Sequence, residues 1–290
     1  MNSIIEIYSL VDNYVTHPRY SARRLMGEHG LSFLIRYRGK SYLFDTGPGF
    51  TLKQNLNALK FDVNNLDSVI LSHSHWDHTG GLEEILKMTG GINVIVHPHI
   101  FADKYIKKGE EEVRKSGLTR DSNYFVQMGA QLKFRQENMR IDNDFYLLGP
   151  VTPQFAFDDG DMKNRVIKGK DGKYYPDDFK DEQYLCINTD RGLVLILGCT
   201  HMGLKNTVFH AMESMEETRV YAILGGLHLF KAHKEHLKEM ARWLNNLGVQ
   251  VLVGAHCTGF ETMAYLKQVL NAKVEFNYVG LKNTILKYCD

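Results

Sequence analysis

Four residues with metal-binding side chains stand close together within residues 72–81, where the sequence reads SHSHWDHTGG. Side chains two apart on an extended backbone point to the same side, so His73 and His75 can converge on one cation. Asp77 and His78 follow at a bend and can face a second cation. Imidazole nitrogen and carboxylate oxygen together suit Zn²⁺, Fe or Mn, and no thiolate stands nearby in the sequence. The spacing therefore predicts an open metal site rather than a closed structural zinc site.

The segments on either side place these residues at a turn from a strand to a helix. The run Val69, Ile70 and Leu71 is typical of a buried strand. The pair Gly80 and Gly81 then precedes an apolar pattern typical of an amphipathic helix. Such turns at the carboxyl ends of strands are where open α/β folds bind ligands. A polar surface loop is the alternative, but it would not need four ligand-type residues directly after an apolar run.

Three strands expected in the second half of the chain also end in a histidine. Each is an apolar run followed by a turn of small residues, and the histidines are His201, His228 and His256. One histidine at a strand end is more often structural than a ligand. Three of them on parallel-type strand ends are much harder to explain by chance. They predict a binuclear centre, in which two residues of the 72–81 stretch and one distal histidine hold each metal ion.

Six stretches, in chain order, resemble motifs of the metallo-β-lactamase superfamily, in the branch named after dihydropterin-(ribofuranosyl)aminobenzene-phosphate synthase. They are GEHGLS, FDTG, SHSHWDHTGGL, GCTHMG, GGLHL and AHCTG. The resemblance implies an α/β fold, a four-layer αββα sandwich. It also implies that His228 belongs to the substrate pocket, with a metal role as the alternative. The metal ligands that it implies are His73, His75, Asp77, His78, His201 and His256.

Two residues near these motifs have alternative roles. Asp45, in the FDTG stretch, either accepts a hydrogen bond from a ligand histidine or forms the turn and caps the next helix, and the resemblance favours the first role. Cys199 stands where the superfamily would have a bridging aspartate. It is either a weak ligand or a small buried residue, and we favour the second. The superfamily's G-H-T-x-G stretch is absent before the hairpin, so the bridging residue stays open.

The expected reaction follows from the metal pair. Two cations that share a water lower its pKa, so the resulting hydroxide is the expected nucleophile toward a phosphoester or a related small molecule. Asp77 would anchor one ion and accept a hydrogen bond from the nucleophile. His228 would protonate a leaving group or bind a phosphoryl oxygen. Glu28, His29 and Thr258 are further candidates for substrate binding, and a solvated loop end is an equal interpretation of the first two.

Three other functions compete with this metal-dependent hydrolase. The branch name implies a pterin-related transferase. A di-iron oxidoreductase on the same scaffold would need iron and a flavodoxin-type partner, and the chain carries no appended flavin-type sequence. A binding protein could keep the metal for ligand sensing without catalysis. Two divalent ions, zinc first and iron or manganese as alternatives, are expected in the leading interpretation.

Composition sets the class of the protein and of its partner. Hydrophobic residues make up 43% and charged residues 24% of the 290 residues, as in globular proteins, and we expect one domain over 1–290. The net charge of +1 gives no electrostatic case for nucleic acid. No apolar stretch approaches the ~20 residues that cross a membrane. The four cysteines are scattered, which favours a reducing cytoplasm over a disulfide framework. A small molecule, phosphorylated in our leading interpretation, is the expected partner, and the oligomeric state is open.

Residues at about 100–182 have little periodicity and are expected to form a cap or insertion over the site. The segment is polar, charged and rich in turns. A structureless loop of this length is unusual in a compact domain unless it is a lid or contacts substrate. We expect a helix around 101–108 and short strands at 131–134 and 145–148.

Overall fold

Two large β-sheets form the centre of this computed structural model, which describes residues 3–15, 24–109, 112–156 and 164–287. The first sheet has seven strands in the order β18 (Lys282–Lys287), β1 (Ser3–Val11), β2 (Ser32–Tyr37), β3 (Lys40–Phe44), β4 (Ser68–Ile70), β5 (Ile92–Val96) and β8 (Ala130–Phe134). The second also has seven, in the order β17 (Lys273–Phe276), β16 (Val251–Ala255), β15 (Val220–Gly226), β14 (Gly192–Leu197), β13 (Tyr184–Thr189), β10 (Phe145–Leu148) and β9 (Met139–Asp142).

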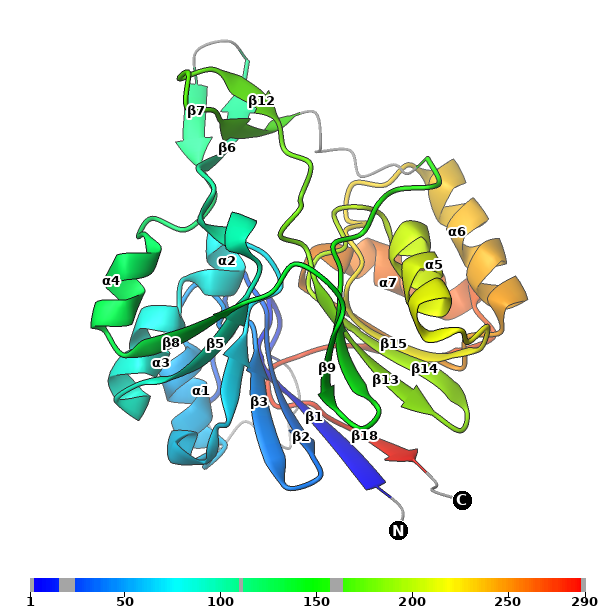
Figure 1. The fold of residues 1–290 in the computed structure, drawn as a ribbon. Helices are drawn as coiled ribbons and strands as arrows, with labels where there is room; N and C mark the ends of the chain where they lie inside the picture. The colour runs from blue at the N-terminus through cyan, green and yellow to red at the C-terminus, as the bar shows by residue number, and fades with distance from the viewer. Residues whose placement is uncertain (1–2, 16–23, 110–111, 157–163, 288–290) are drawn as a thin grey trace.

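Helices cover the outer face of each sheet, which gives the molecule four layers (Figure 1). The first sheet is covered by α1 (Leu52–Ala58), α3 (Leu82–Thr89) and α4 (Ser122–Gln127), and the second by α5 (Leu204–Met215), α6 (Lys234–Leu247) and α7 (Phe260–Val269). None of the helices in the described ranges is both long and apolar enough to cross a bilayer. The layer order confirms the expected α/β fold of αββα type.

Strand β14 shows how the sequence is divided between the layers. All of its residues are buried, because both faces of the second sheet are covered. Leu195 and Leu197 pack in the core beneath the helices α5 to α7. Val194 and Ile196 point the other way, into the core between the two sheets. Because side chains alternate between the two faces of a strand, this fully apolar strand contributes to both cores.

The strands that precede the candidate ligands run parallel to their neighbours. In the second sheet β14 pairs with β15 and β15 with β16, all in parallel, and in the first sheet β3, β4, β5 and β8 form a parallel series. Parallel strands end at the same edge of a sheet, so the turns after β14, β15 and β16 lie side by side. The short helix α2 (Trp76–Thr79), which the sequence pattern did not reveal, follows the turn after β4.

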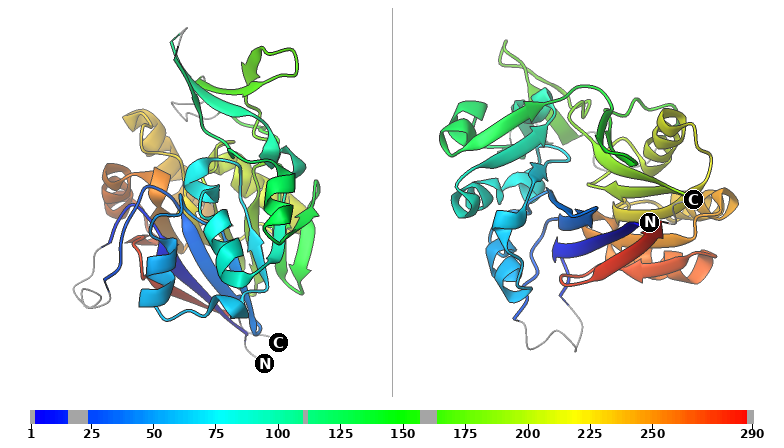
Figure 2. Two further views of the ribbon diagram at one scale, coloured as in Figure 1. Left: turned by 90° about the vertical axis from the view of Figure 1, so that its left-hand side faces the viewer. Right: turned by 60° about the horizontal axis from the view of Figure 1, so that its bottom comes forward.

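A third, smaller sheet stands above the sandwich, at the end opposite the two termini (Figures 1 and 2). Its four strands, here called the cap sheet, have the order β12 (Tyr174–Pro176), β11 (Arg165–Lys168), β6 (Lys104–Lys108) and β7 (Glu112–Lys115). The cap sheet pairs two segments far apart in the chain, since β6 is hydrogen-bonded to β7 on one side and to β11 on the other.

The cap differs from the sequence-based expectation in two respects. The helix expected around 101–108 is wrong: a 3-10 turn, η3 (Pro98–Phe101), ends there and β6 follows, because this strand has partners on both edges. The strands expected at 131–134 and 145–148 do form. They belong to the two large sheets, as β8 and β10, and not to the cap. The stretch 100–182 therefore supplies cap strands only toward its two ends.

A buried ion cluster fixes the cap sheet to the sandwich. Lys104, on β6, is buried, and its Nζ lies 3.0 Å from Asp177 Oδ2 and 2.5 Å from Asp181 Oδ1. Burial lowers the pKa of Lys104, but the two carboxylates outweigh it and raise the pKa above its usual value. Asp181 Oδ2 also accepts a hydrogen bond of 2.8 Å from the backbone N–H of Ser74. The base of the cap is thus joined to the histidine-rich loop.

Lys104→Met is expected to lower the free energy of unfolding by about 3–5 kcal/mol, because it leaves two buried carboxylates without a cation. Lys115→Met, on the neighbouring strand β7, is the matched control. Its ion pair with Asp103 is partly exposed, and its loss costs less than about 1 kcal/mol. Urea denaturation measures both. Equal losses in the two variants would show that the buried cluster does not stabilise the cap.

Candidate metal centre

Three histidines from two strand ends bring their ring nitrogens together. His73 and His75 follow β4, and His201 follows β14. His73 Nε2 lies 3.0 Å from His75 Nδ1 and 3.3 Å from His201 Nε2. All three side chains are buried, and their nitrogens are close enough to hold one ion. These residues are the first donor group.

Hydrogen bonds fix which nitrogen of two histidines faces the centre. Ser72 Oγ donates to Asp45 Oδ2 at 2.6 Å, so it accepts from His73 Nδ1 at 2.9 Å. With its proton on Nδ1, the neutral ring of His73 turns the Nε2 lone pair toward the first donor group. Asp45 Oδ2 also accepts from His78 Nδ1 at 2.7 Å. The structure thus confirms the predicted hydrogen bond between Asp45 and a candidate ligand histidine.

A second donor group surrounds the carboxylate of Asp77. Its Oδ2 lies 3.2 Å from His256 Nε2 and 3.3 Å from His29 Nε2. His256 Nδ1 donates to Asn13 Oδ1 at 2.9 Å, so Nε2 of the neutral ring faces the carboxylate as a second acceptor. Burial lowers the pKa of His256 to about 4, and a proton therefore does not bridge the pair at neutral pH. Two facing acceptors fit a metal ion, which attracts both.

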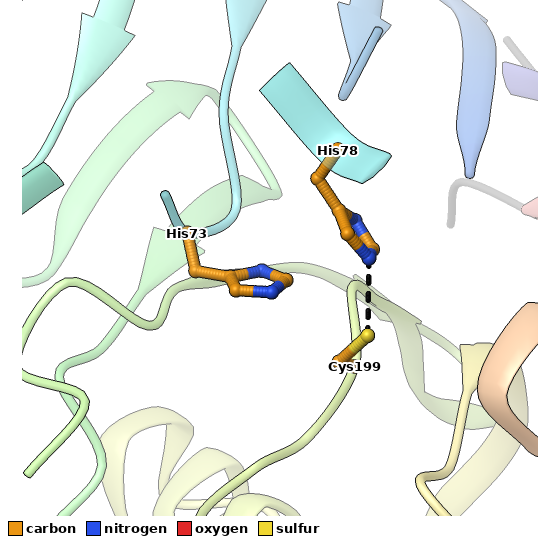
Figure 3. A group of neighbouring side chains, drawn as sticks. All are labelled: His73, His78 and Cys199. Atoms are coloured by element: carbon orange, nitrogen blue, oxygen red, sulfur yellow. Dashed lines mark hydrogen bonds between the residues drawn. The ribbon is translucent and has the colours of Figure 1, made fainter. Parts of the chain in front are cut away.

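The sulfur of Cys199 is within reach of both donor groups. Cys199 Sγ lies 3.0 Å from His78 Nε2, and Figure 3 shows this pair pointing toward each other beside His73. The thiol clusters with His73 and His78, and it also clusters with His256 and Cys257. Burial, and then the neighbouring Cys257, raise the pKa of Cys199 well above its usual value. Cys199 is buried, as the favoured interpretation expects, and its sulfur also lies among candidate ligand atoms, so a role as a weak ligand stays a prediction.

The protonation states of most candidate ligands suit a cation. Burial is the main cause that lowers the pKa of His73, His75 and His201 well below the usual value, so these rings are neutral. Burial raises the pKa of Asp77, but the neighbouring histidines outweigh it and hold the pKa well below its usual value. His78 differs. Burial lowers its pKa, yet Asp45 raises it to about 9, so an ion at Nε2 displaces a proton.

Buried carboxylates hold the backbone of three loops that carry candidate ligands. The pairs of acceptor and donor are Asp45 with Ser72 N at 2.6 Å, Asp181 with Ser74 N at 2.8 Å, Glu182 with His201 N at 2.6 Å, and Asp12 with His256 N at 3.3 Å. Burial raises the pKa of Asp12 and of Glu182 to about 7. Sequence reasoning missed Asp12, Asp181 and Glu182 as site residues, because no local spacing marks them and only the fold brings them to the loops.

The backbone is strained where the ligand turns begin. Four of the non-glycine residues with left-handed φ angles lie at these turns: Asp45 at 59°, Thr200 at 61°, His228 at 48° and His256 at 46°. Each such conformation costs about 1–3 kcal/mol unless its surroundings enforce it, and strain of this kind gathers at functional sites. The hydrogen bonds that the buried carboxylates of Asp45 and Asp12 accept from backbone N–H groups supply that enforcement at the turns of Asp45 and His256.

One cavity of about 390 Å³ opens onto both donor groups. The candidate residues that line it are His29, His75, Asp77, Cys199, His201, His228 and His256. The donor atoms are therefore open to a small molecule on one side. An open position is what separates catalytic from structural metal sites.

Comparison with known proteins agrees with this geometry. The family model of the metallo-beta-lactamase superfamily matches residues 25–201, more than half of the chain. The chain belongs to the metallo-β-lactamase superfamily. With its two donor groups, it is a metal-dependent, hydrolase-like member of that superfamily.

Individual proteins match almost the whole chain. The chain is 29% identical over 266 residues to 7,8-dihydropterin-6-methyl-4-(beta-D-ribofuranosyl)-aminobenzene-5'-phosphate synthase of Methanocaldococcus jannaschii. The aligned region covers 89% of this chain and 88% of that protein. The crystal structure of Tm1679, a metal-dependent hydrolase of the beta-lactamase superfamily, matches with a TM-score of 0.78 and 28% identity over 96% of this chain and 98% of that one. YhfI from Bacillus subtilis, at 12% identity, a TM-score of 0.58 and coverage of 98% and 100%, supports the fold alone.

Two of the four residues predicted to bind substrate line the cavity that opens onto the donor groups. The ring centroid of His228 lies 4.5 Å from that of His201, and His228 lines the cavity from the second half of the chain. His29, predicted at the pocket mouth, is exposed and reaches the Asp77 carboxylate. Its position makes it a candidate third member of the second donor group as well as a substrate contact.

The other two, Glu28 and Thr258, make local hydrogen bonds. The Glu28 carboxylate accepts from Thr51 N at 3.0 Å, at the start of α1, and Thr258 Oγ1 accepts from Leu227 N at 3.1 Å. Neither residue is among those lining the cavity in the described part of the chain. Their role in substrate binding stays a prediction.

Asp45→Ala is expected to lower the free energy of unfolding by about 3 kcal/mol, because Ser72 and His78 lose a buried acceptor. The folded variant should also hold less zinc after dialysis. Asp67→Ala is the matched control, since its exposed carboxylate accepts one hydrogen bond from Ser41 N, worth about 1 kcal/mol or less. Denaturant titration and elemental analysis measure the two effects. An Asp45→Ala variant as stable and as rich in metal as Asp67→Ala would contradict the role of Asp45.

Proposed function

We propose that the chain is a metal-dependent hydrolase that uses two divalent ions to cleave a phosphoester or a related small molecule. Zinc is the first choice of metal, with iron and manganese as alternatives. The observation that supports this most is that two donor groups, contributed by both halves of the fold, open into one cavity. The residues of a closed structural site would have no such access.

Each donor group accounts for one ion. His73, His75 and His201 would hold the first, and Asp77 and His256 the second, with Cys199 in reach of both and His78 beside His73 and Cys199. When bound, the two ions would supply an activated water at neutral pH and polarise the bond to be cleaved.

Two side chains, apart from the ions, would take part in the proposed reaction. Asp77 is ionised, and the histidine nitrogens of His29 and His256 both lie near its Oδ2, so the carboxylate can orient the attacking water. His228 comes from the other half of the fold and faces the same cavity. It would donate a proton to the leaving group or a hydrogen bond to a phosphoryl oxygen.

A pterin-related transferase is the second candidate function. It is favoured by the 29% identity, over 89% of this chain, to the M. jannaschii synthase, whose name joins a dihydropterin to an aminobenzene ribofuranosyl phosphate. The two candidates share the metal centre and differ in the nucleophile: water attacks in a hydrolase, whereas a second substrate attacks in a transferase. A product in which the second substrate is bonded to a group of the first, with the leaving group released, would identify the transferase.

Removal of the metal is expected to abolish turnover. The purified protein, treated with a chelator and then reloaded separately with zinc, manganese or iron, is tested on phosphomonoesters, phosphodiesters and lactones. We expect no turnover without metal and recovery with at least one ion. Equal turnover before and after chelation, or no turnover of any substrate with any ion, would contradict the proposed hydrolase.

Asp77→Asn is expected to lower kcat by about 10²-fold or more, because the amide neither attracts the second ion nor accepts as strongly from water. Asp67→Asn changes the same functional group at an exposed position away from the cavity and should leave kcat unchanged. Steady-state kinetics on the best substrate of the screen compares them. If Asp77→Asn turned over as fast as Asp67→Asn, Asp77 would have no part in the reaction.

A further inference from the structure

The cap sheet turns two arginines toward the metal centre. Arg114 on β7, Ile106 on β6 and Arg165 on β11 line the same cavity as the donor groups. Ile106 is the cross-strand partner of both arginines. Directly paired residues of an antiparallel sheet project from one face, so the two guanidinium groups flank Ile106 on the face above the metal centre. The expected cap thus contributes a defined row of side chains.

The cavity wall beside this row has unsatisfied polar atoms. Ser116 stands two residues after Arg114, on the same side of the chain, and lines the cavity. Its Oγ is buried without a hydrogen-bond partner, and so is Nε2 of His75, which lines the same cavity. Buried polar atoms in native proteins nearly always have a partner, so these two indicate a bound ligand with acceptor oxygens.

The charge of the cavity points to an anion. Asp77 is the one acidic residue that lines it within the described ranges, and the donor groups would add the charge of the ions. Arg114 is exposed and has no carboxylate partner in the part of the chain that the structure describes. The charge of Arg165 acts on the metal centre. Burial is the largest cause of the lowered pKa of His75, and the positive charge of Arg165 is the second.

We propose that Arg114 and Arg165 form an anion subsite that binds a phosphate monoester group of the substrate, separate from the bond that is cleaved. The planar guanidinium groups match phosphate oxygens in pairs, and Ser116 Oγ would donate to a remaining oxygen. Binding of the phosphate group to the two arginines does not depend on the proposed function. Only the statement that another bond of the same molecule is cleaved rests on it. The substrate class is then a small molecule with a spare phosphate dianion.

The subsite is tested by titrating inorganic phosphate into the zinc-loaded protein in an isothermal titration calorimeter. Arg114→Gln should weaken phosphate binding at least about tenfold, since it removes a charged hydrogen-bonding group. Arg165→Lys keeps the charge but loses the paired geometry, and should weaken it less. Lys115→Gln is the matched control, because Lys115 is adjacent to Arg114 but points to the opposite face of β7, and should bind as the wild type does.

The test separates this inference from the proposed function. Phosphate held by the ions alone would bind equally to the wild type, Arg114→Gln and Arg165→Lys, and that result would overturn the subsite. The absence of phosphate binding to the wild type would overturn it too. If no substrate is turned over with any metal while Arg114→Gln still weakens phosphate binding, the hydrolase proposal fails and the anion subsite stands.

Discussion

The arrangement of the site depends on charged groups that are buried beneath it. The loops that carry His73 to His78, His201 and His256 each have a backbone N–H bound to a buried carboxylate: Asp45, Asp181, Glu182 or Asp12. A buried carboxylate without a partner is costly, so each loop and its acceptor stabilise one another. The loops can therefore hold left-handed turns and facing acceptor atoms that would otherwise relax.

This constraint also joins the layers of the fold. Asp181 links the cap, through Lys104, to the loop of the first sheet that contains Ser74. Its neighbour Glu182 holds the turn of the second sheet that contains His201. Two adjacent acidic residues thus bring the cap and both sheets to one point. The metal-binding atoms, the cavity and the arginines of the cap sheet are arranged around it.

Much of this could be predicted from the sequence, and the reasons for the rest are physical. Apolar runs that end in His201, His228 and His256 predicted parallel strand ends because the pattern is local, and the superfamily motifs implied the αββα layers. The helix expected around 101–108 was wrong because pairing with two distant strands decides the structure of that segment. The roles of Asp12, Asp181 and Glu182 could not be predicted, since a buried acidic residue looks in sequence like any polar loop residue.

The account rests on both halves of the chain holding ions at one centre. Equilibrium dialysis of the wild type and of His201→Ala against zinc, followed by elemental analysis, measures this most directly. We predict about two ions per chain in the wild type and about one in His201→Ala, because that variant removes a donor of the first group only. A wild type that binds no zinc, or a folded His201→Ala variant that binds as many ions as the wild type, would contradict the account.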